Sequence, residues 1–398
     1  MAGAISFEQA RECVLREVRA GLPALAVEPL AALEAAGRVL AEPIVADRDY
    51  PPFARSVRDG FAVRSSDLPG TLCVAGEVRA GQVYAGSVGP GEAVEIMTGA
   101  PLPEGADQVV MAEHTLREGE AVRIDRPGKA GDNFSPLGVE ASQGAPVLSP
   151  GRRLGFAEIA LLAMVGRANV SVYRQPRVAI VPTGDELVDV DQTPAPFQIR
   201  NSNAWSLAAQ VARAGGIPQI LGIARDNYES TRELVEQGLA SDLLLLSGGV
   251  SVGKYDIVER VLADLGAQFF FDRVKIQPGQ PVVFGHARAR FFFGLPGNPG
   301  STMVTFETLA RAAVELLSGE TAPMFPLMRA RLARDFQQHP GLTRFLPARL
   351  SPNGSEIAPE LSQGSGDVAA LARANAFLVT DPDRETWRAG DDIRVLLK

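Results

Sequence analysis

Between residues 177 and 317 the sequence alternates strand-like and helix-like stretches, and this alternation constrains the fold more than any other feature. Short apolar runs alternate with segments whose apolar residues recur at helical spacing, as in a parallel sheet covered by helices. We therefore predict a doubly wound α/β domain. The strand candidates are residues 178–181, 219–223, 243–246, 269–276, 282–285 and 291–294, and the helix candidates are 203–214, 230–239, 256–265 and 301–317.

The sequence on either side of this domain has other patterns. Residues 7–18 have helical spacing behind Ser6, a candidate N-cap, and residues 29–40 and 151–165 also look helical. We expect the 151–165 helix to pack with the N-terminal one. Short strand-like runs between glycines and prolines indicate β structure elsewhere. The predicted units are a helical and extended linker module (1–45 with 146–175), a mostly β domain (46–145), the α/β domain (176–320) and a C-terminal β-barrel (325–398).

Composition excludes several classes of protein. The 398 residues carry a formal charge of −8 without a block of lysine and arginine, which argues against nucleic acid or an anionic membrane as the main partner. Cys13 and Cys73 lack a metal-ligand spacing and suit a reducing compartment. We find no leader-like start and no apolar run of roughly 20 residues, the length of a membrane span. We expect a cytosolic protein without membrane contact.

A glycine-rich turn is the first candidate site. The segment Ser247-Gly-Gly-Val-Ser-Val-Gly-Lys-Tyr-Asp256 follows the strand predicted at 243–246 and precedes a helix. Backbone N–H groups in such a turn can bind a phosphate or another oxyanion. Asp256 adds a carboxylate that could hold a divalent cation against that anion.

Polar residues also follow the other predicted strands. In open α/β sheets ligands bind beyond the carboxyl ends of the strands, so these residues would share one rim with the glycine-rich turn. Carboxylates and glycine turns together suit a site for Mg²⁺ and phosphate. Ordinary turn chemistry is the alternative, since Gly, Pro, Asp and Asn are common in turns. The segments are Pro182-Thr-Gly-Asp-Glu186, Arg225-Asp226-Asn227 and Leu295-Pro-Gly-Asn-Pro-Gly-Ser301.

Three of these segments, residues 182–187, 247–256 and 295–301, resemble signature motifs of the molybdopterin molybdenumtransferases, the family of MoeA and the gephyrin E domain. Two further segments agree, namely Pro51-Pro-Phe-Ala-Arg-Ser-Val-Arg-Asp-Gly-Phe-Ala-Val63 and Thr98-Gly-Ala-Pro-Leu-Pro-Glu-Gly-Ala-Asp107. The resemblance covers residues 7–397 in the family's order. It implies a MogA-like α/β domain that binds molybdopterin. It also implies an elongated homodimer, whose cleft is lined by the α/β domain of one subunit and the mostly β domain of the other.

The activity that this resemblance implies is the last step of molybdenum cofactor assembly. Molybdate is inserted into adenylylated molybdopterin, and AMP is released in a Mg²⁺-dependent step. Transient contact with other cofactor-assembly proteins is a further implied interaction. Glu186, Asp226 and Asp256 are the expected metal ligands and catalytic carboxylates, because Mg²⁺ stabilises charge that develops on phosphoryl oxygens. Asp59 would position the nucleophilic oxyanion or water, and Thr98 would donate its hydroxyl. Both could instead be turn residues.

The chain departs from the family pattern in its positive charge. The hallmark Lys-Pro-Gly-Lys-Pro reads Gln277-Pro-Gly-Gln-Pro281. Arg273 and Lys275 alternate with Gln277, so all three would face one side of a strand. Lys254, in the glycine-rich turn, is a second candidate for replacing the lost charge. Arg344 could bind an oxyanion or be an exposed strand residue. The expected substrate-binding residues are Ser247, Gly248, Gly249, Ser251, Gly253, Pro296, Gly297, Asn298, Lys275, Arg344 and Ser365.

Two functions of different class follow from these features. The first is an active molybdenumtransferase with an altered anion site, and the second is a non-catalytic, gephyrin-like scaffold or binding paralogue. The clustered carboxylates favour the enzyme, because such clusters are costly without a function. The missing lysines favour the scaffold. The extra β domains argue against the adenylylation step of the related single-domain enzymes, and these residues do not distinguish tungstate from molybdate.

Overall fold

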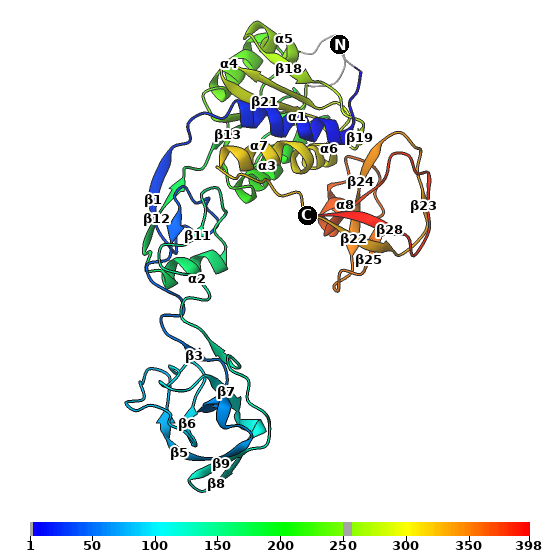
Figure 1. The fold of residues 1–398 in the computed structure, drawn as a ribbon. Coiled ribbons are helices and arrows are strands. Elements are labelled where there is room, and N and C mark those ends of the chain that lie inside the picture. Colours follow the sequence, from blue (N-terminus) through cyan, green and yellow to red (C-terminus); the bar gives the residue numbers. More distant parts are fainter. Residues whose placement is uncertain (1–2, 250–256) are drawn as a thin grey trace.

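The computed structural model describes residues 3–249 and 257–398. The chain is elongated: an α/β domain and a C-terminal barrel lie together, and an arm extends away from them (Figure 1). We define the arm as residues 27–173, from β1 (Val27–Ala31) to β12 (Asn169–Tyr173). It holds a linker module near the α/β domain and a mostly β domain at its far end. The predicted multidomain α/β and β fold is confirmed.

The α/β domain is built on a six-stranded sheet of order β16-β13-β17-β21-β20-β18. The first four strands are parallel, and β20 pairs antiparallel with β21 on one side and with β18 on the other. β17, the apolar run before the glycine-rich turn, is buried along its whole length because helices cover both faces of the sheet. The strands are β13 (Arg177–Pro182), β16 (Ile217–Ile220), β17 (Leu243–Ser247), β18 (Gln268–Phe271), β20 (Val283–Ala287) and β21 (Arg290–Leu295).

Successive residues of the central strands face two separate hydrophobic cores. Val178 and Ile180 belong to the core under α3 and α7, whereas Ala179 and Val181 belong to the core under α4 and α5. This alternation is the period of two that an extended strand imposes. The domain is therefore doubly wound, as predicted. Its helices are α3 (Ser202–Arg213), α4 (Tyr228–Gly238), α5 (Ile257–Asp264), α6 (Pro299–Thr305) and α7 (Arg311–Leu317), with a π-helical turn (Phe306–Ala310) between the last two.

The N-terminal helix α1 (Phe7–Ala20) begins at the predicted N-cap Ser6, whose hydroxyl accepts from the Gln9 N–H as part of a capping box. The prediction that it packs with the 151–165 helix was wrong. Phe7, Val14 and Val18 lie in the α/β core beside α7, whereas α2 (Phe156–Met164) packs inside the linker module. The apolar stripe of α1 is thus buried against a domain that is distant in sequence.

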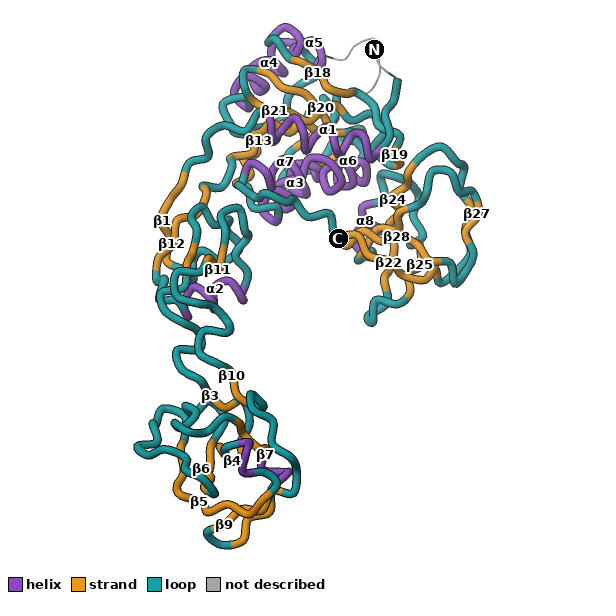
Figure 2. Tube along the Cα trace, in the orientation of Figure 1, coloured by secondary structure: helices purple, strands orange, loops and turns teal. Residues whose placement is uncertain are grey.

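The second predicted helix, at residues 29–40, was also wrong. Residues 27–31 form β1, which pairs with β12, and turns follow as far as Gly37 at φ +81°. The alanines there favour a helix, but Pro29 and the β12 ladder fix the backbone as a strand, so tertiary pairing overrides local propensity. The short pairs β2 (Ile44–Val45) with β11 (Pro146–Leu148) and β3 (Arg55–Ser56) with β10 (Phe134–Ser135) continue the arm outward (Figure 2).

The far end of the arm is a six-stranded sheet of order β7-β4-β6-β5-β9-β8. Its strands separate two small apolar cores, one containing Phe61 and Val63 and the other Ala62 and Val94. The strands are β4 (Gly60–Val63), β5 (Gly70–Val78), β6 (Glu92–Ile96), β7 (Gln108–Met111), β8 (Leu116–Glu118) and β9 (Ala121–Ile124).

The C-terminal region is a closed five-stranded barrel, because β24 pairs with both β25 and β26. One predicted strand, at residues 269–276, is split between two sheets. Its first part is β18, and its end is β19 (Ile276–Gln277), which pairs with the barrel beside Thr343. The barrel strands are β22 (Leu327–Leu332), β24 (Thr343–Leu350), β25 (Glu356–Pro359), β26 (Ala376–Val379) and β28 (Asp392–Leu397), with β23 (Phe336–Gln337), β27 (Thr386–Trp387) and α8 (Val368–Arg373) beside them.

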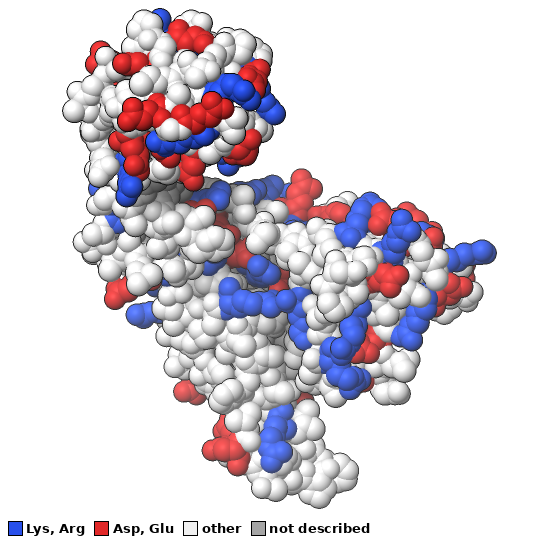
Figure 3. Space-filling model, turned by 90° about the horizontal axis from the view of Figure 1, so that it is seen from below, with Lys and Arg blue, Asp and Glu red and all other residues white. Residues whose placement is uncertain are grey.

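Charged side chains of both signs are interspersed on the face of the molecule shown in Figure 3, over the arm and the barrel alike. On this face, neither the basic nor the acidic side chains gather into one block. Within the described ranges, no helix combines the length and apolar character needed to cross a membrane.

Candidate functional site

A cavity of about 920 Å³ lies at the carboxyl ends of the parallel strands, where the sequence predicted a shared rim. Its walls come from the loops after β13, β16, β17 and β21 and from the start of α3. A cavity of this volume has room for a large small-molecule ligand. It brings together eight of the predicted site residues, namely Glu186, Asp226, Ser247, Gly248, Gly249, Pro296, Gly297 and Asn298.

The two glycines after β17 are required by their backbone conformation and by a close neighbour. Gly248 and Gly249 have φ of +97° and +64°, in the left-handed region. A Cβ on Gly248 would lie 2.8 Å from the Thr183 Oγ1 atom, and one on Gly249 would lie 2.9 Å from it. The N–H of Gly248 donates to the carbonyl of Leu295, at 3.0 Å, so the sheet already uses this amide. The turn therefore has one amide fewer for an anion than the sequence suggested.

Asn203, which the sequence reasoning missed, connects three walls of the cavity. Its side-chain amide donates to the Ser247 hydroxyl at 3.0 Å and to the carbonyl of Gly297 at 2.8 Å. Its Oδ1 atom and the Thr183 Oγ1 atom are buried and have no hydrogen-bond partner in the part of the chain that the structure describes. Buried polar atoms of this kind usually have a partner, so both are candidate ligand contacts. The signal was the polar run Asn201-Ser-Asn203 at a helix start.

Hydrogen bonds between two loops, one after β13 and one after β16, fix the carboxylates on the rim. Asp226 and Asp185 exchange bonds, since each side chain accepts from the other residue's backbone N–H, at 3.3 and 3.1 Å. The Arg225 guanidinium donates to three carbonyls of the opposite loop, including that of Leu187 at 3.1 Å. The Glu186 carboxylate lies over Gly184, where a Cβ would come within 2.3 Å of it. This leaves Glu186 and Asp226 as oxygen donors at one cavity.

Oxygen donors of this type fit Mg²⁺, which prefers carboxylates and water. Within residues 3–249 and 257–398, however, no group of three or more His, Cys, Asp or Glu side chains is arranged to hold a metal. Asp256, the third carboxylate of the predicted set, lies outside the described residues, as do Ser251, Gly253 and Lys254. The Mg²⁺ site therefore stays a prediction.

Asp59 and Thr98 lie together at the far end of the arm, in the turns before β4 and after β6. The Asp59 Oδ1 atom accepts from the Thr98 N–H at 2.7 Å and from the Thr98 hydroxyl at 2.8 Å. These two bonds, the backbone one first, lower the pKa of Asp59, because they favour the charged carboxylate. Neither residue lines the cavity of its own chain, and Figure 1 shows the arm carrying them away from it.

A second cavity, of about 540 Å³, lies between the α/β domain and the barrel and shares Pro281 with the first. Gln277, Gln280 and the predicted Ser365 line it. Lys275 and Arg344 line neither cavity among the described residues. Lys275 is exposed, and the Arg344 guanidinium donates to the carbonyl of His339 at 3.0 Å.

Curated relatives match nearly the whole chain. A molybdopterin molybdenumtransferase from Bacillus subtilis is 36% identical over 374 residues, which cover 90% of this chain and 87% of that protein. One from Staphylococcus epidermidis is 35% identical, covering 92% and 89%. The chain belongs to the MoeA family of molybdopterin molybdenumtransferases. Membership of this enzyme family of molybdenum cofactor biosynthesis, predicted from five motifs, is thereby confirmed.

Three family models match successive parts of the chain, and solved MoeA structures match nearly all of it. The MoeA N-terminal region (domain I and II) matches residues 5–166, a probable molybdopterin binding domain matches 179–316, and the MoeA C-terminal region (domain IV) matches 329–398. Two crystal structures of Pyrococcus horikoshii MoeA proteins each cover 99% of this chain. Their TM-scores are 0.79 at 27% identity, with all of that chain covered, and 0.70 at 31% identity, with 99% covered.

Proposed function

We propose that the protein inserts molybdate into adenylylated molybdopterin and releases AMP in a Mg²⁺-dependent step. The observation that supports this most is the cavity at the strand ends of a MoeA-family chain, where two rim carboxylates stand beside a serine-glycine turn. A nucleotide-linked pterin needs both a large concave site and groups that manage phosphoryl charge, and this cavity offers both.

The chain's own residues would bind and orient the substrate. Asn203 fixes the Ser247 hydroxyl by donating to it at 3.0 Å, which leaves the Ser247 hydroxyl hydrogen free to point at an oxyanion. The Thr183 hydroxyl, buried beside Gly248 and Gly249, is a second donor. Donors fixed before the substrate arrives stabilise developing charge without reorganising at the moment of reaction.

Glu186 and Asp226 are the residues that would hold Mg²⁺, with Asp256 as the third member of the set. When bound, the ion would neutralise negative charge on the phosphoryl oxygens of the substrate. The exchange of bonds between Asp226 and Asp185 positions the Asp226 carboxylate before any ligand is present. That arrangement suits a ligand set in which each carboxylate is fixed by a neighbouring group.

Asp59 would act from the other subunit of a homodimer. Its lowered pKa keeps it a carboxylate at neutral pH, so it can accept a hydrogen bond from the attacking water or position the attacking oxyanion. Thr98 holds it by two hydrogen bonds. The position of this pair at the far end of an extended arm supports a site completed by a second copy, because the arm carries the pair away from its own cavity.

The decisive experiment incubates the purified protein with adenylylated molybdopterin, Mg²⁺ and molybdate and measures AMP by chromatography. We expect AMP release that depends on both ions, and the Asp226→Ala variant should release none. Absence of AMP even at high molybdate would instead support the gephyrin-like scaffold. Repeating the assay with tungstate identifies the preferred oxyanion. Sedimentation tests whether the protein is a homodimer. We also propose that the reaction takes place in the cytoplasm and that other cofactor-assembly proteins dock transiently.

A further inference from the structure

We infer that Arg153 is a positioning residue, which fixes the angle of the arm against the α/β domain. The inference rests on the proposed function, because the arm carries Asp59 and Thr98 to the reacting groups. Two covalent connections, residues 21–26 and 174–176, join the arm to the α/β domain. Neither connection is part of a helix, so side-chain contacts have to resist bending of the arm at this joint.

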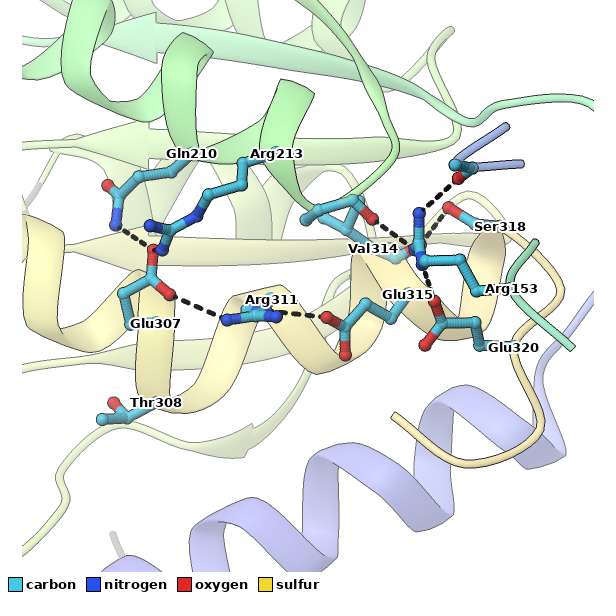
Figure 4. A network of polar contacts seen from close by, with 12 residues as sticks. Arg153, Gln210, Arg213, Glu307, Thr308, Arg311, Val314, Glu315, Ser318 and Glu320 are labelled. Carbon is cyan, nitrogen blue, oxygen red and sulfur yellow. Dashed lines mark hydrogen bonds and ion pairs between the residues drawn. The ribbon is translucent and has the colours of Figure 1, made fainter. Parts of the chain in front are cut away.

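Arg153 uses its guanidinium in three directions at the joint (Figure 4). Its Nη1 atom donates to the carbonyl of Gly37, within the arm, at 2.7 Å. Its Nη2 atom donates to the carbonyl of Ala214, at the end of α3, at 3.0 Å, and its Nε atom pairs with the carboxylate of Glu320, just after α7. One planar side chain thus ties the arm to two separate points of the α/β domain, which lysine could not reproduce.

The two anchor points belong to one rigid unit. Glu307 and Glu315 are buried on α7 and the turn before it, and Arg311 pairs with both, at 3.3 and 2.7 Å (Figure 4). Arg213 and Gln210, on α3, bind the same Glu307 at 2.6 and 2.7 Å. Because α3 is bound to the buried Glu307 carboxylate, and Arg311 joins Glu307 to α7, we expect the carbonyl of Ala214 and the carboxylate of Glu320 to move as one unit.

Three glycines at the joint allow the arm and the α/β domain to pack closely, because a Cβ at any of them would clash with a side chain of the other part. Gly151, Gly215 and Gly319 all have φ between +85° and +95°. A Cβ added to Gly151 would lie 2.4 Å from the Thr321 Cγ2 atom. A Cβ on Gly215 would lie 2.9 Å from the Arg153 Nη1 atom, and one on Gly319 would lie 2.1 Å from the Tyr173 Cδ2 atom. The backbone of each domain therefore packs directly against side chains of the other, and bending the arm would open this contact.

Arg152 provides a matched control. It is the preceding residue and pairs with Glu158 at 2.7 Å, so both partners lie within the arm. Removing its charge should leave the joint unchanged, because neither Arg152 nor Glu158 belongs to the α/β domain. The comparison of Arg153→Met with Arg152→Met therefore isolates the contacts across the joint.

The angle can be measured between spin labels on the exposed native Cys73, in the arm, and on Glu233→Cys, exposed on α4. Pulsed electron resonance with excess unlabelled protein reports distances within one chain. We expect Arg153→Met to widen the distance distribution and Arg152→Met to leave it unchanged. The kcat for AMP release should fall about ten-fold or more in Arg153→Met, while KM changes less than about two-fold, since misplacing a reacting group by about 1 Å can cost about 100-fold in rate.

Glu320→Gln is the second variant, because its amide keeps the shape and loses the charge, and it should widen the distribution less. It also decides the question if Arg153→Met does not fold. An unchanged distance distribution would overturn the inference, and so would a widened one with an unchanged kcat. If the wild-type protein releases no AMP, the proposed function fails, and the distance distributions alone decide whether Arg153 fixes the arm.

Discussion

The rim of the α/β sheet and the tip of the arm hold their candidate site residues in different ways. At the rim, Ser247 and Asn203 come from separate elements of one packed domain, and a hydrogen bond of 3.0 Å joins them. At the tip, Asp59 is exposed, and among the described residues its carboxylate accepts hydrogen bonds from Thr98 alone. The rim is thus pre-organised by its own core, whereas the tip depends on the arm that carries it. Substitutions in the two regions should therefore affect the kinetics of AMP release in different ways.

The largest expected effect is the loss of a rim carboxylate. Asp226→Asn should lower the kcat for AMP release by about 100-fold or more, because removing one preorganised electrostatic group at a phosphoryl site has an effect of this order. Steady-state kinetics with saturating Mg²⁺ measures it. Asp185→Asn is the control, since Asp185 exchanges bonds with Asp226 but does not line the cavity. Equal losses in the two variants would contradict a direct role for Asp226.

Mixed dimers test whether the tip of one chain completes the rim of another. Asp59→Asn and Asp226→Asn chains, each inactive alone, should regain activity when they are unfolded and refolded together. Half of the random dimers would be mixed, and one of the two sites in each would be intact, so about a quarter of wild-type activity should return in a two-fold symmetric dimer. No recovery would mean that both residues act within one chain.

The hydroxyl of Thr98 should affect the pH dependence of the reaction. The pKa of Asp59 is lowered, so its carboxylate form is lost only as pH falls through that lowered value. Thr98→Val removes one of the two donors and should raise the pKa of Asp59, which moves the acid limb of kcat/KM to higher pH and changes little at neutral pH. Thr115→Val is the control, because in the part of the chain that the structure describes the Thr115 hydroxyl donates to the carbonyl of Ala112 and not to Asp59. An unmoved acid limb would exclude Asp59 as the titrating group.

The smallest expected effect concerns the cavity beside the barrel. Gln277→Lys with Gln280→Lys adds positive charge to its wall and should lower the KM for molybdate about five-fold, which corresponds to ~1 kcal/mol for a partly solvated pair. The gain should shrink with added salt, as screening requires. Gln237→Lys, exposed on α4, is the matched control for charge alone. A gain that salt does not reduce would argue against an anion in this cavity.

The sequence predicted the rim well because two independent signals, the strand period and the residue types of the loops, coincide there. The strand period and the loop chemistry both pointed to Ser247, Glu186 and Asp226, and sheet topology then placed the loops at one edge. Asn203 escaped because a polar residue inside a predicted helix looks like a solvent-facing residue. That the amide of Gly248 is occupied also could not be foreseen, since its bond to Leu295 depends on which strand pairs with β17.

Errors at residues 29–40 and at α1 share one physical cause. Local propensity fits both segments to helices, but partners more than a hundred residues away decide their structure and packing, β12 for the first and α7 for the second. The charge of Lys275 was assigned to the site on strand alternation, which placed it correctly on an exposed face with Arg273 and Gln277. Alternation does not say which cavity that face borders, and Lys275 borders neither of the two.

The place of α1 in the α/β core has a consequence for synthesis on the ribosome. The helix is made first, yet its apolar stripe packs against α7, at residues 311–317, so it must wait until most of the chain has been translated. The arm, in contrast, contains all the strands that pair within it and can fold while the α/β domain is still incomplete. The arm is thus an insertion between the first helix of a domain and the rest of that domain, and its early folding shortens the loop that α1 must close.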